Sequence, residues 1–218
     1  MISDPDWSAI LFDLDGTVAD TVNMILACYR HTMEAHLGEV PPDECWLSGM
    51  GTPLVTQLRG FARSQEEGEA MLETYQTYQR SIHPSMVAPF PGIPEVLEKL
   101  TERRIPLAIV TSKRQEMAIW TLSACGLGDR FPTVVTASDI TKGKPDPEPV
   151  LLALEWLGIA PSPRVLFVGD SIHDVGAGQA AGVRTAAVTW GPFAADELQV
   201  VEPDFMVGEP GELLALKP

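Results

Sequence analysis

Residues 9–17 read AILFDLDGT, and this stretch passes from an apolar run into a turn that carries two carboxylates. The run Ala9–Leu14 has the length of a buried strand. The Asp-Gly pair that follows is typical of a sharp turn. Asp13 and Asp15 therefore stand where a predicted strand ends, and open α/β sheets bind ligands at that edge. An aspartate at a strand end also commonly caps a turn, so this stretch alone does not separate structure from function.

Five further short apolar runs bounded by turn signals predict strands at Leu107–Thr111, Thr133–Thr136, Val165–Val168, Thr185–Val188 and Phe205–Val207. Helical patterns lie beside them at Ile93–Arg103, Gln115–Cys125, Pro147–Leu157 and Ile172–Ala181. Strands that alternate with helices of this size form βαβ units with a mainly parallel sheet. The sequence thus predicts an α/β fold with a Rossmann-like core.

The chain between the first strand and the helix at Ile93–Arg103 has a different pattern. Apolar residues recur at helical spacing over Val22–Leu37, and Ser64–Glu67 fits a capping box that opens another helix. No strand pattern is present there. The predicted domains are a core of residues 1–18 and 89–218 and an inserted all-helical cap of residues 19–88.

Composition narrows the class of partner. The formal net charge of −15 over 218 residues disfavours binding to nucleic acids or anionic membranes. No apolar stretch approaches the roughly 20 residues that cross a bilayer, and the first residues lack the basic region of a secretory signal. Three scattered cysteines do not form a disulfide framework. We therefore expect a cytoplasmic protein whose oligomeric state the sequence leaves open.

Three more polar clusters follow predicted strands or lie in loops beside them: Val110–Lys113, Lys142–Pro147 and Gly169–Asp174. Each has an ordinary interpretation: Thr111 could cap a helix, Lys144 could be a solvated loop lysine, and Asp174 could favour a helix N-terminus electrostatically. Together, however, the clusters supply several carboxylates, a hydroxyl and a lysine to one edge of the sheet. Such hard oxygen ligands suit Mg²⁺ bound together with a substrate phosphate.

With these four clusters the chain resembles the haloacid dehalogenase superfamily of phosphohydrolases, in its branch like phosphoglycolate phosphatase. Phe12–Asp20 resembles the first family motif, Val110–Lys113 the second, Lys144-Pro145 the third and Gly169–Asp174 the fourth. Four motifs in order are far more specific than one, and the resemblance covers nearly the whole chain. It also places the cap between the first two motifs.

The resemblance implies a Mg²⁺-dependent phosphatase acting on a small phosphorylated metabolite through an aspartyl-phosphate. It gives Asp13 as nucleophile and metal ligand, and Asp15 as general acid and base with a backbone carbonyl on the metal. Thr111 and Ser112 would bind the transferring phosphoryl group.

The resemblance further implies that Lys144 balances charge between the phosphoryl group and the nucleophile. Asp170 would ligate Mg²⁺, while Asp174 would hold metal-bound water or a neighbouring ligand. These assignments agree with electrostatics, because a carboxylate can attack a phosphate dianion only when cations screen both anions.

Substrate choice is expected to depend on the cap. The loop Leu47–Leu54 contains two glycines, Gly49 and Gly51, that allow close backbone approach to a small ligand. Gly49 and Thr52 are the candidate substrate contacts, although the loop could equally be a plain interhelical turn. Arginines that could meet a second anionic group are Arg59, Arg63 and Arg114. The resemblance makes 2-phosphoglycolate the first guess. Pyrophosphate, nucleotides and a broad range of phosphoesters remain alternatives.

Other chemistries fit the sequence less well than a phosphatase. A dehalogenase needs no acid two residues after its nucleophile, so Asp15 favours phosphoryl transfer. Phosphonate-cleaving relatives use a cap lysine, and no lysine stands between Thr17 and Pro91. A sugar-phosphate mutase stays open. A catalytically silent binding protein on the same fold is disfavoured, because the four residues whose loss would favour it are all present: Asp13, Asp15, Lys144 and Asp170.

Overall fold

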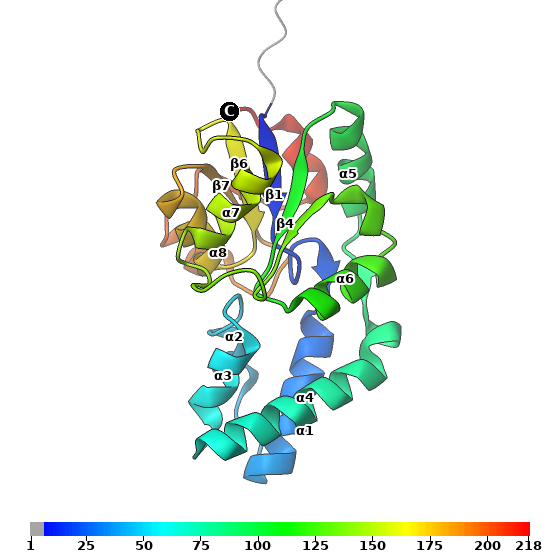
Figure 1. The fold of residues 1–218 in the computed structure, drawn as a ribbon, viewed down its shortest axis with the longest axis vertical. Coiled ribbons are helices and arrows are strands. Elements are labelled where there is room, and N and C mark those ends of the chain that lie inside the picture. The colour runs from blue at the N-terminus through cyan, green and yellow to red at the C-terminus, as the bar shows by residue number, and fades with distance from the viewer. Residues whose placement is uncertain (1–6) are drawn as a thin grey trace, which may run out of the picture.

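The computed structural model describes residues 7–218, so residues 1–6 of the predicted core lie outside the described residues. Its main sheet contains β1 (Ala9–Phe12), β4 (Leu107–Val110), β5 (Thr133–Val135), β6 (Val165–Gly169), β7 (Arg184–Val188) and β8 (Phe205–Val207). The order is β5-β4-β1-β6-β7-β8, and every neighbouring pair is parallel. The predicted α/β fold with a parallel sheet is confirmed (Figure 1).

The central strand β1 pairs on one side with β4 and on the other with β6. After β1 the chain builds the sheet outward through β4 and β5, and then reverses direction to add β6, β7 and β8. The reversal places the carboxyl ends of β1, β4 and β6 side by side. This is the position at which doubly wound sheets bind their ligands.

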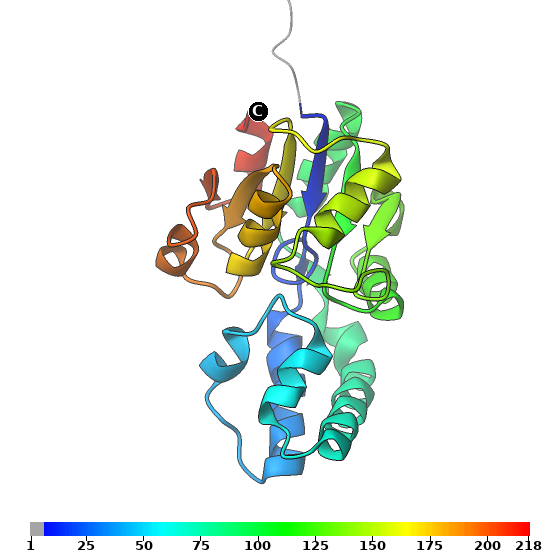
Figure 2. The ribbon, with the colours of Figure 1, turned by 60° about the vertical axis from the view of Figure 1, so that its left-hand side comes forward.

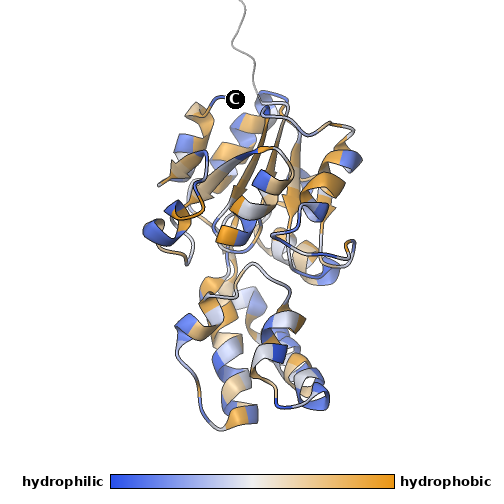
Figure 3. Ribbon diagram, turned by 90° about the vertical axis from the view of Figure 1, so that its left-hand side faces the viewer, coloured by the Kyte–Doolittle hydropathy of each residue, from blue (hydrophilic) through white to orange (hydrophobic). Residues whose placement is uncertain are grey.

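Helices cover both faces of this sheet. One face carries α5 (Ile93–Glu102), α6 (Gln115–Ala124) and η2 (Pro210–Ala215), and the other carries α7 (Glu148–Leu157) and α8 (Ile172–Ala180). Along β1, Ile10 and Phe12 pack toward the first face while Ala9 and Leu11 pack toward the second. The strands therefore carry apolar side chains on both sides. In Figure 3 most of the sheet has the colour of hydrophobic residues. The short elements η1 (Gly128–Arg130) and α9 (Ala195–Gln199) complete this part of the chain.

Four helices lie beyond the carboxyl edge of the sheet (Figures 1 and 2). These cap helices are α1 (Val22–Leu37), α2 (Asp43–Leu47), α3 (Leu54–Phe61) and α4 (Gln65–Met86). They enclose their own apolar cluster, in which Tyr29 and Trp46 stack with ring centroids 4.9 Å apart. The predicted capping box is present in part, since Ser64 Oγ accepts a hydrogen bond of 3.1 Å from the Glu67 N–H at the start of α4.

A two-residue antiparallel pair, β2 (Ala19–Asp20) with β3 (Ala88–Pro89), joins the two crossings between the cap helices and the sheet. The sequence indicated no strand here, because two residues are too few to show an alternating pattern. The pair holds the outgoing and returning chains together at the base of the helices.

Several predicted strands run past their observed ends. The predicted Ala9–Leu14 stops at Phe12, although the Asp13 N–H still donates to the Val168 carbonyl at 2.8 Å. The chain then turns at Gly16, whose φ of 81° is the left-handed conformation that glycine adopts without strain. Asp13 therefore sits on the last paired position before the turn.

Within residues 7–218, no helix combines the length and the apolar character needed to cross a membrane.

The core predicts a clear stability contrast between two leucines. Leu97 on α5 is fully buried, whereas Leu151 on α7 is 39 % exposed. We expect Leu97→Ala to lower the free energy of unfolding by about 2–5 kcal/mol, because a buried leucine leaves a cavity. Leu151→Ala should change it by less than about 1 kcal/mol. Urea denaturation of the two variants measures both values, and equal losses would contradict this packing.

Candidate active site

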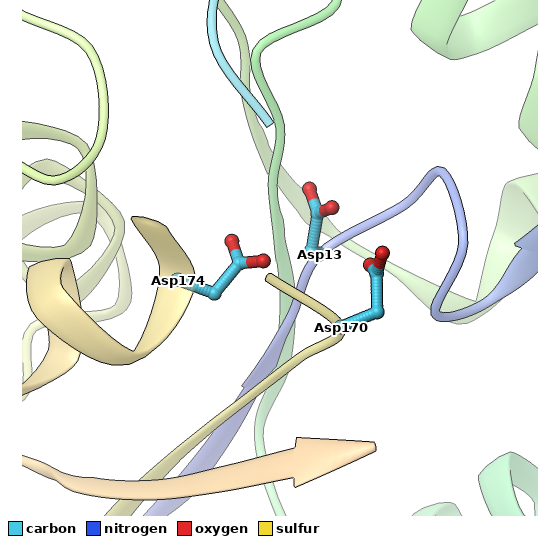
Figure 4. Close-up of side chains that lie close together, drawn as sticks. All are labelled: Asp13, Asp170 and Asp174. Carbon is cyan, nitrogen blue, oxygen red and sulfur yellow. The ribbon is translucent and has the colours of Figure 1, made fainter. Parts of the chain in front are cut away.

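Three aspartates, two from neighbouring strand ends and one from the helix that follows, converge at the carboxyl edge of the sheet. Asp13 follows β1, Asp170 follows β6, and Asp174 lies in the first turn of α8. Their side chains point toward one another (Figure 4), and each offers a carboxylate oxygen within 4.8 Å of the other two. All three are almost fully buried.

Lys144 reaches this cluster from the loop before α7. Its ammonium donates to Asp13 Oδ1 at 2.8 Å, to Asp174 Oδ1 at 2.6 Å and to the Val110 carbonyl at 3.4 Å. The side chain is 1 % exposed, so the ion pairs are shielded from water. Lys144 thus joins the ends of β1 and β4 to the start of α8.

Local contacts orient the other two carboxylates. Asp174 Oδ2 accepts hydrogen bonds from the Ser171 N–H and hydroxyl, and Ser171 Oγ accepts from the Asp174 N–H in return, which forms a capping box on α8. The Thr17 hydroxyl donates to Asp170 Oδ1 at 2.7 Å. Both oxygens of Asp174 are consequently engaged by protein groups, whereas Asp170 has only one neutral donor among the described residues.

The electrostatics of the cluster are unbalanced. The pKa of Asp13 is raised to about 7. Burial is the largest cause, Lys144 opposes it, and the charges of Asp174 and Asp15 add to the rise. Burial also raises the pKa of Asp170, helped by the charges of Asp13 and Asp174. Burial alone would lower the pKa of Lys144, but the two carboxylates that it contacts outweigh this and raise it. Three carboxylates around one ammonium form a site that favours an added cation.

Asp15 lies beside this cluster with partners of its own. Its Oδ1 accepts a hydrogen bond of 2.6 Å from the Thr21 hydroxyl and an ion-paired hydrogen bond from Lys113 Nζ. The side chain of Asp15 is 18 % exposed and lines the same cavity as Asp13. The sequence did not indicate the Lys113 and Thr21 contacts, because Lys113 lies 98 residues away along the chain.

The cavity has a volume of about 280 Å³ and lies between the sheet edge and the cap helices. Of the residues predicted to bind the phosphoryl group, Thr111 and Ser112 both line it. Thr111 is buried, and its Oγ1 accepts from the Lys113 N–H at 3.2 Å. It is not the residue that caps α6, because that position belongs to Arg114.

The loop between α2 and α3 closes over the cavity through Gly51. The Ser112 hydroxyl donates to the Gly51 carbonyl, and a Cβ at position 51 would lie 2.8 Å from Ser171 Oγ. Thr52 lines the cavity, whereas Gly49 is not among its lining residues and instead faces Gln57. The sequence offered both glycines of this loop for close backbone approach, and the approach to the core occurs at Gly51 rather than at Gly49.

Of the three arginines considered for a second anionic group, only one lines the cavity. Arg59 is exposed and outside the lining, and Arg63 pairs with Glu67 on the cap surface. Arg114 lines the cavity and is exposed.

Comparisons with known proteins agree with this geometry. A family model described as haloacid dehalogenase-like hydrolase matches residues 10–188. The chain is 38 % identical over 213 residues to a Bacillus velezensis protein named pyrophosphatase PpaX, covering 98 % of this chain and 97 % of that protein.

Among solved structures, a putative haloacid dehalogenase-like hydrolase from Bacteroides fragilis has a TM-score of 0.87 at 28 % identity, covering 95 % of this chain and 100 % of that one. A predicted phosphoglycolate phosphatase from Haemophilus somnus has a TM-score of 0.88 at 21 % identity, covering 96 % and 97 %, and shows the shared fold.

The contact at Gly51 predicts how the loop responds to a side chain. Gly51 has a φ of 93° and no room for a Cβ beside Ser171, so Gly51→Ala should displace the loop from the core. We expect a larger radius of gyration in small-angle X-ray scattering, with the helical circular dichroism signal retained. Gly60→Ala is the matched control, because a Cβ at position 60 on α3 meets nothing within 4 Å. Identical scattering from both variants and the parent would contradict closure through this contact.

Proposed function

Because the chain belongs to the haloacid dehalogenase-like hydrolase family and is a phosphatase of that family, we propose that it hydrolyses a small phosphate ester with Mg²⁺ and with Asp13 as the nucleophile. The observation that carries this proposal is the buried contact of Lys144 with both Asp13 and Asp174, beside Asp170. The residues 19–88 act as a cap over a core of residues 1–18 and 89–218 in this proposal.

The donor set fits a magnesium ion. The three clustered groups are carboxylates, which are hard oxygen ligands, and their negative charges exceed the single positive charge of Lys144. Asp13 and Asp170 would hold the ion together with the backbone carbonyl of Asp15. Asp174 would act through a bound water, since both its oxygens already accept hydrogen bonds. Bound Mg²⁺ supplies a charge that offsets the repulsion between the phosphate and the attacking carboxylate.

Asp13 then attacks phosphorus, and the bond from phosphorus to the leaving oxygen breaks. Lys144 holds the Asp13 carboxylate in place and screens the negative charge that gathers on the phosphoryl oxygens. Thr111, which lines the cavity, donates a hydrogen bond from its hydroxyl to those oxygens. Ser112 also lines the cavity and can do the same once its hydroxyl leaves the Gly51 carbonyl. The product of this step is an aspartyl-phosphate on residue 13.

Asp15 handles the protons in both steps. It donates a proton to the leaving oxygen and afterwards takes one from the water that attacks the aspartyl-phosphate. The second displacement breaks the bond between phosphorus and the Asp13 oxygen and releases inorganic phosphate. Because the Asp15 carboxylate accepts hydrogen bonds from Lys113 and Thr21 in the resting site, it must leave those contacts and take up a proton from solvent before it donates to the leaving oxygen.

The identity of the substrate and the cellular location are also part of the proposal. The resemblance makes 2-phosphoglycolate the first guess, and the Bacillus velezensis relative carries the name of a pyrophosphatase. Both compounds bear a second anionic group, so the charges that line the cavity bear directly on the choice. The net charge of −15 supports a small metabolite rather than a nucleic acid or membrane as partner. A cytoplasmic location stays an expectation from the sequence.

Two other functions would use the same site. A sugar-phosphate mutase would use the same Asp13 and Asp15 but return the phosphoryl group to an organic acceptor instead of water. A catalytically silent binding protein would bind phosphate without turnover. Release of inorganic phosphate from an ester under multiple-turnover conditions distinguishes the phosphatase from both.

Replacement of the nucleophile is the direct test. Asp13→Asn should lower kcat for p-nitrophenyl phosphate by at least about a thousandfold, because an amide does not form the acyl-phosphate. The helical circular dichroism signal should stay unchanged. Asp129→Asn, at an exposed position in η1, is the matched control and should keep full activity. Normal turnover by the Asp13→Asn variant would place the nucleophile elsewhere.

Removal of the metal gives a second test with a readout besides activity. EDTA should abolish hydrolysis, and Mg²⁺ at about 100 times its Kd should stabilise the folded protein by about 2.7 kcal/mol. Asp170→Asn should lose this metal-dependent rise in Tm, because it removes one of the clustered carboxylates. Differential scanning calorimetry with and without Mg²⁺ measures this rise in Tm. A rise of equal size in Asp170→Asn and in the parent would contradict a metal held by Asp170.

A further inference from the structure

The cavity divides into two halves of different charge. All the charged side chains in its lining come from the sheet edge and its loops: Asp13, Asp15, Asp170, Lys113, Lys144 and Arg114. Within the described chain, the cap helices and the loops between them contribute only uncharged side chains to the lining. The cap half of the cavity is therefore neutral. In the proposed mechanism the phosphoryl group lies against Asp13, so the leaving group would extend toward this half.

The face that α4 turns toward the cavity has a defined composition. Leu72, Tyr75, Gln76 and Gln79 line the cavity at the spacing of one helical face. No hydrogen bond of the Gln76 or Gln79 side chain to another described residue is present, although Gln79 is only 5 % exposed. These carboxamides are available to a bound molecule and offer both donors and acceptors.

Two buried polar atoms of other lining residues also lack partners within residues 7–218. Gln57 directs its amino group to the Thr52 carbonyl at 3.0 Å, which leaves Oε1 as a buried acceptor without a donor. The indole Nε1 of Trp46 is a buried donor without an acceptor. A hydroxyl group can donate and accept, so it is suited to such surroundings, whereas a carboxylate or phosphate only accepts.

A second anion in this half would lose its water beside side chains that carry no charge. The three cations of the lining all come from the sheet side: in the resting site Lys144 is ion-paired with Asp13 and Asp174, and Lys113 with Asp15. Arg114 is exposed, so water screens its charge. Burying an uncompensated charge beside apolar and amide groups is strongly unfavourable, while burying a hydroxyl that finds a partner is not.

Resting on the function proposed above, we propose that the substrate is a phosphate monoester of a small uncharged alcohol, and that Gln76 on α4 helps to select it. The volume of about 280 Å³ lies just below the roughly 300 Å³ at which ligand pockets usually begin, so the alcohol is small. Substrates with a second anionic group at the leaving end, including 2-phosphoglycolate and pyrophosphate, are then the disfavoured class.

Matched substrates test the charge of the leaving group directly. Glycerol 3-phosphate and 3-phosphoglycerate differ by a hydroxymethyl group against a carboxylate, and 2-hydroxyethyl phosphate differs from 2-phosphoglycolate in the same way. With Mg²⁺ present, we expect kcat/KM to be at least about tenfold higher for the neutral member of each pair. Pyrophosphate should rank with the anionic members.

A charge placed on α4 should reverse the preference. Gln76→Arg brings a cation into the neutral half, so kcat/KM for 3-phosphoglycerate and pyrophosphate should rise while that for glycerol 3-phosphate falls. Thr77→Arg is the matched control, because it adds the same charge at the next position of α4, which lies outside the lining. It should leave the ranking of substrates as in the parent.

Hydrolysis of p-nitrophenyl phosphate distinguishes a failure of the leaving-group inference from a failure of the proposed phosphatase function. If it is hydrolysed and an anionic member of a pair is nevertheless preferred, the leaving-group inference is overturned and the phosphatase stands. If no phosphate ester is hydrolysed with Mg²⁺, the proposed function fails and the inference with it. Equal effects of Gln76→Arg and Thr77→Arg on the ranking would also overturn the role given to Gln76.

Discussion

The buried ammonium of Lys144 is the contact on which the rest of the site depends. It is one charge with two carboxylate partners, Asp13 at 2.8 Å and Asp174 at 2.6 Å, and none of the three has appreciable access to water. Each charge would be costly to bury alone, and loss of one partner from such a group typically costs about 3–5 kcal/mol. The loop before α7, the end of β1 and the start of α8 are thereby held in one arrangement.

That arrangement leaves little space around the aspartates. A Cβ at Gly16 would lie 2.5 Å from Asp170 Oδ2, and one at Gly169 would lie 2.3 Å from the Asp174 Cβ. Glycine at these positions lets the backbone approach the carboxylates closely. The remaining polar contacts, from Thr17 to Asp170 and from Ser171 to Asp174, fix how the carboxylates are turned. Such preorganisation means that little rearrangement is needed when a phosphate group enters.

The cap helices contribute shape and uncharged groups to the cavity, and the sheet edge contributes charge. The apolar cluster of the cap helices, which includes Tyr29, Trp46 and Met71, is separate from the two clusters that flank the sheet. The cap loop reaches the core through backbone at Gly51. Groups that act on phosphorus can therefore stay constant while side chains on α4 change to suit different leaving groups.

Much of the fold and the core of the site followed from the sequence. Strand length and the alternation with helices predicted the parallel sheet, and a parallel sheet necessarily brings the carboxyl ends of its strands to one edge. Asp13, Thr111 and Asp170 each follow directly after a strand, so their proximity could be anticipated. The two-residue pair β2–β3 could not, because so short a segment has no period.

Contacts between distant segments were decided by tertiary structure alone. Lys113 pairs with Asp15 across 98 residues, and Ser112 bonds to Gly51 across 61 residues; neither partner carries a local signature of the other. On α4 the sequence indicated the capping box at which the helix begins, but only the packed helix shows that Gln76 and Gln79 line the cavity beside Tyr75. The periodicity of a sequence indicates which face of a helix or strand is buried. Which other element that face contacts is decided by how the whole chain packs.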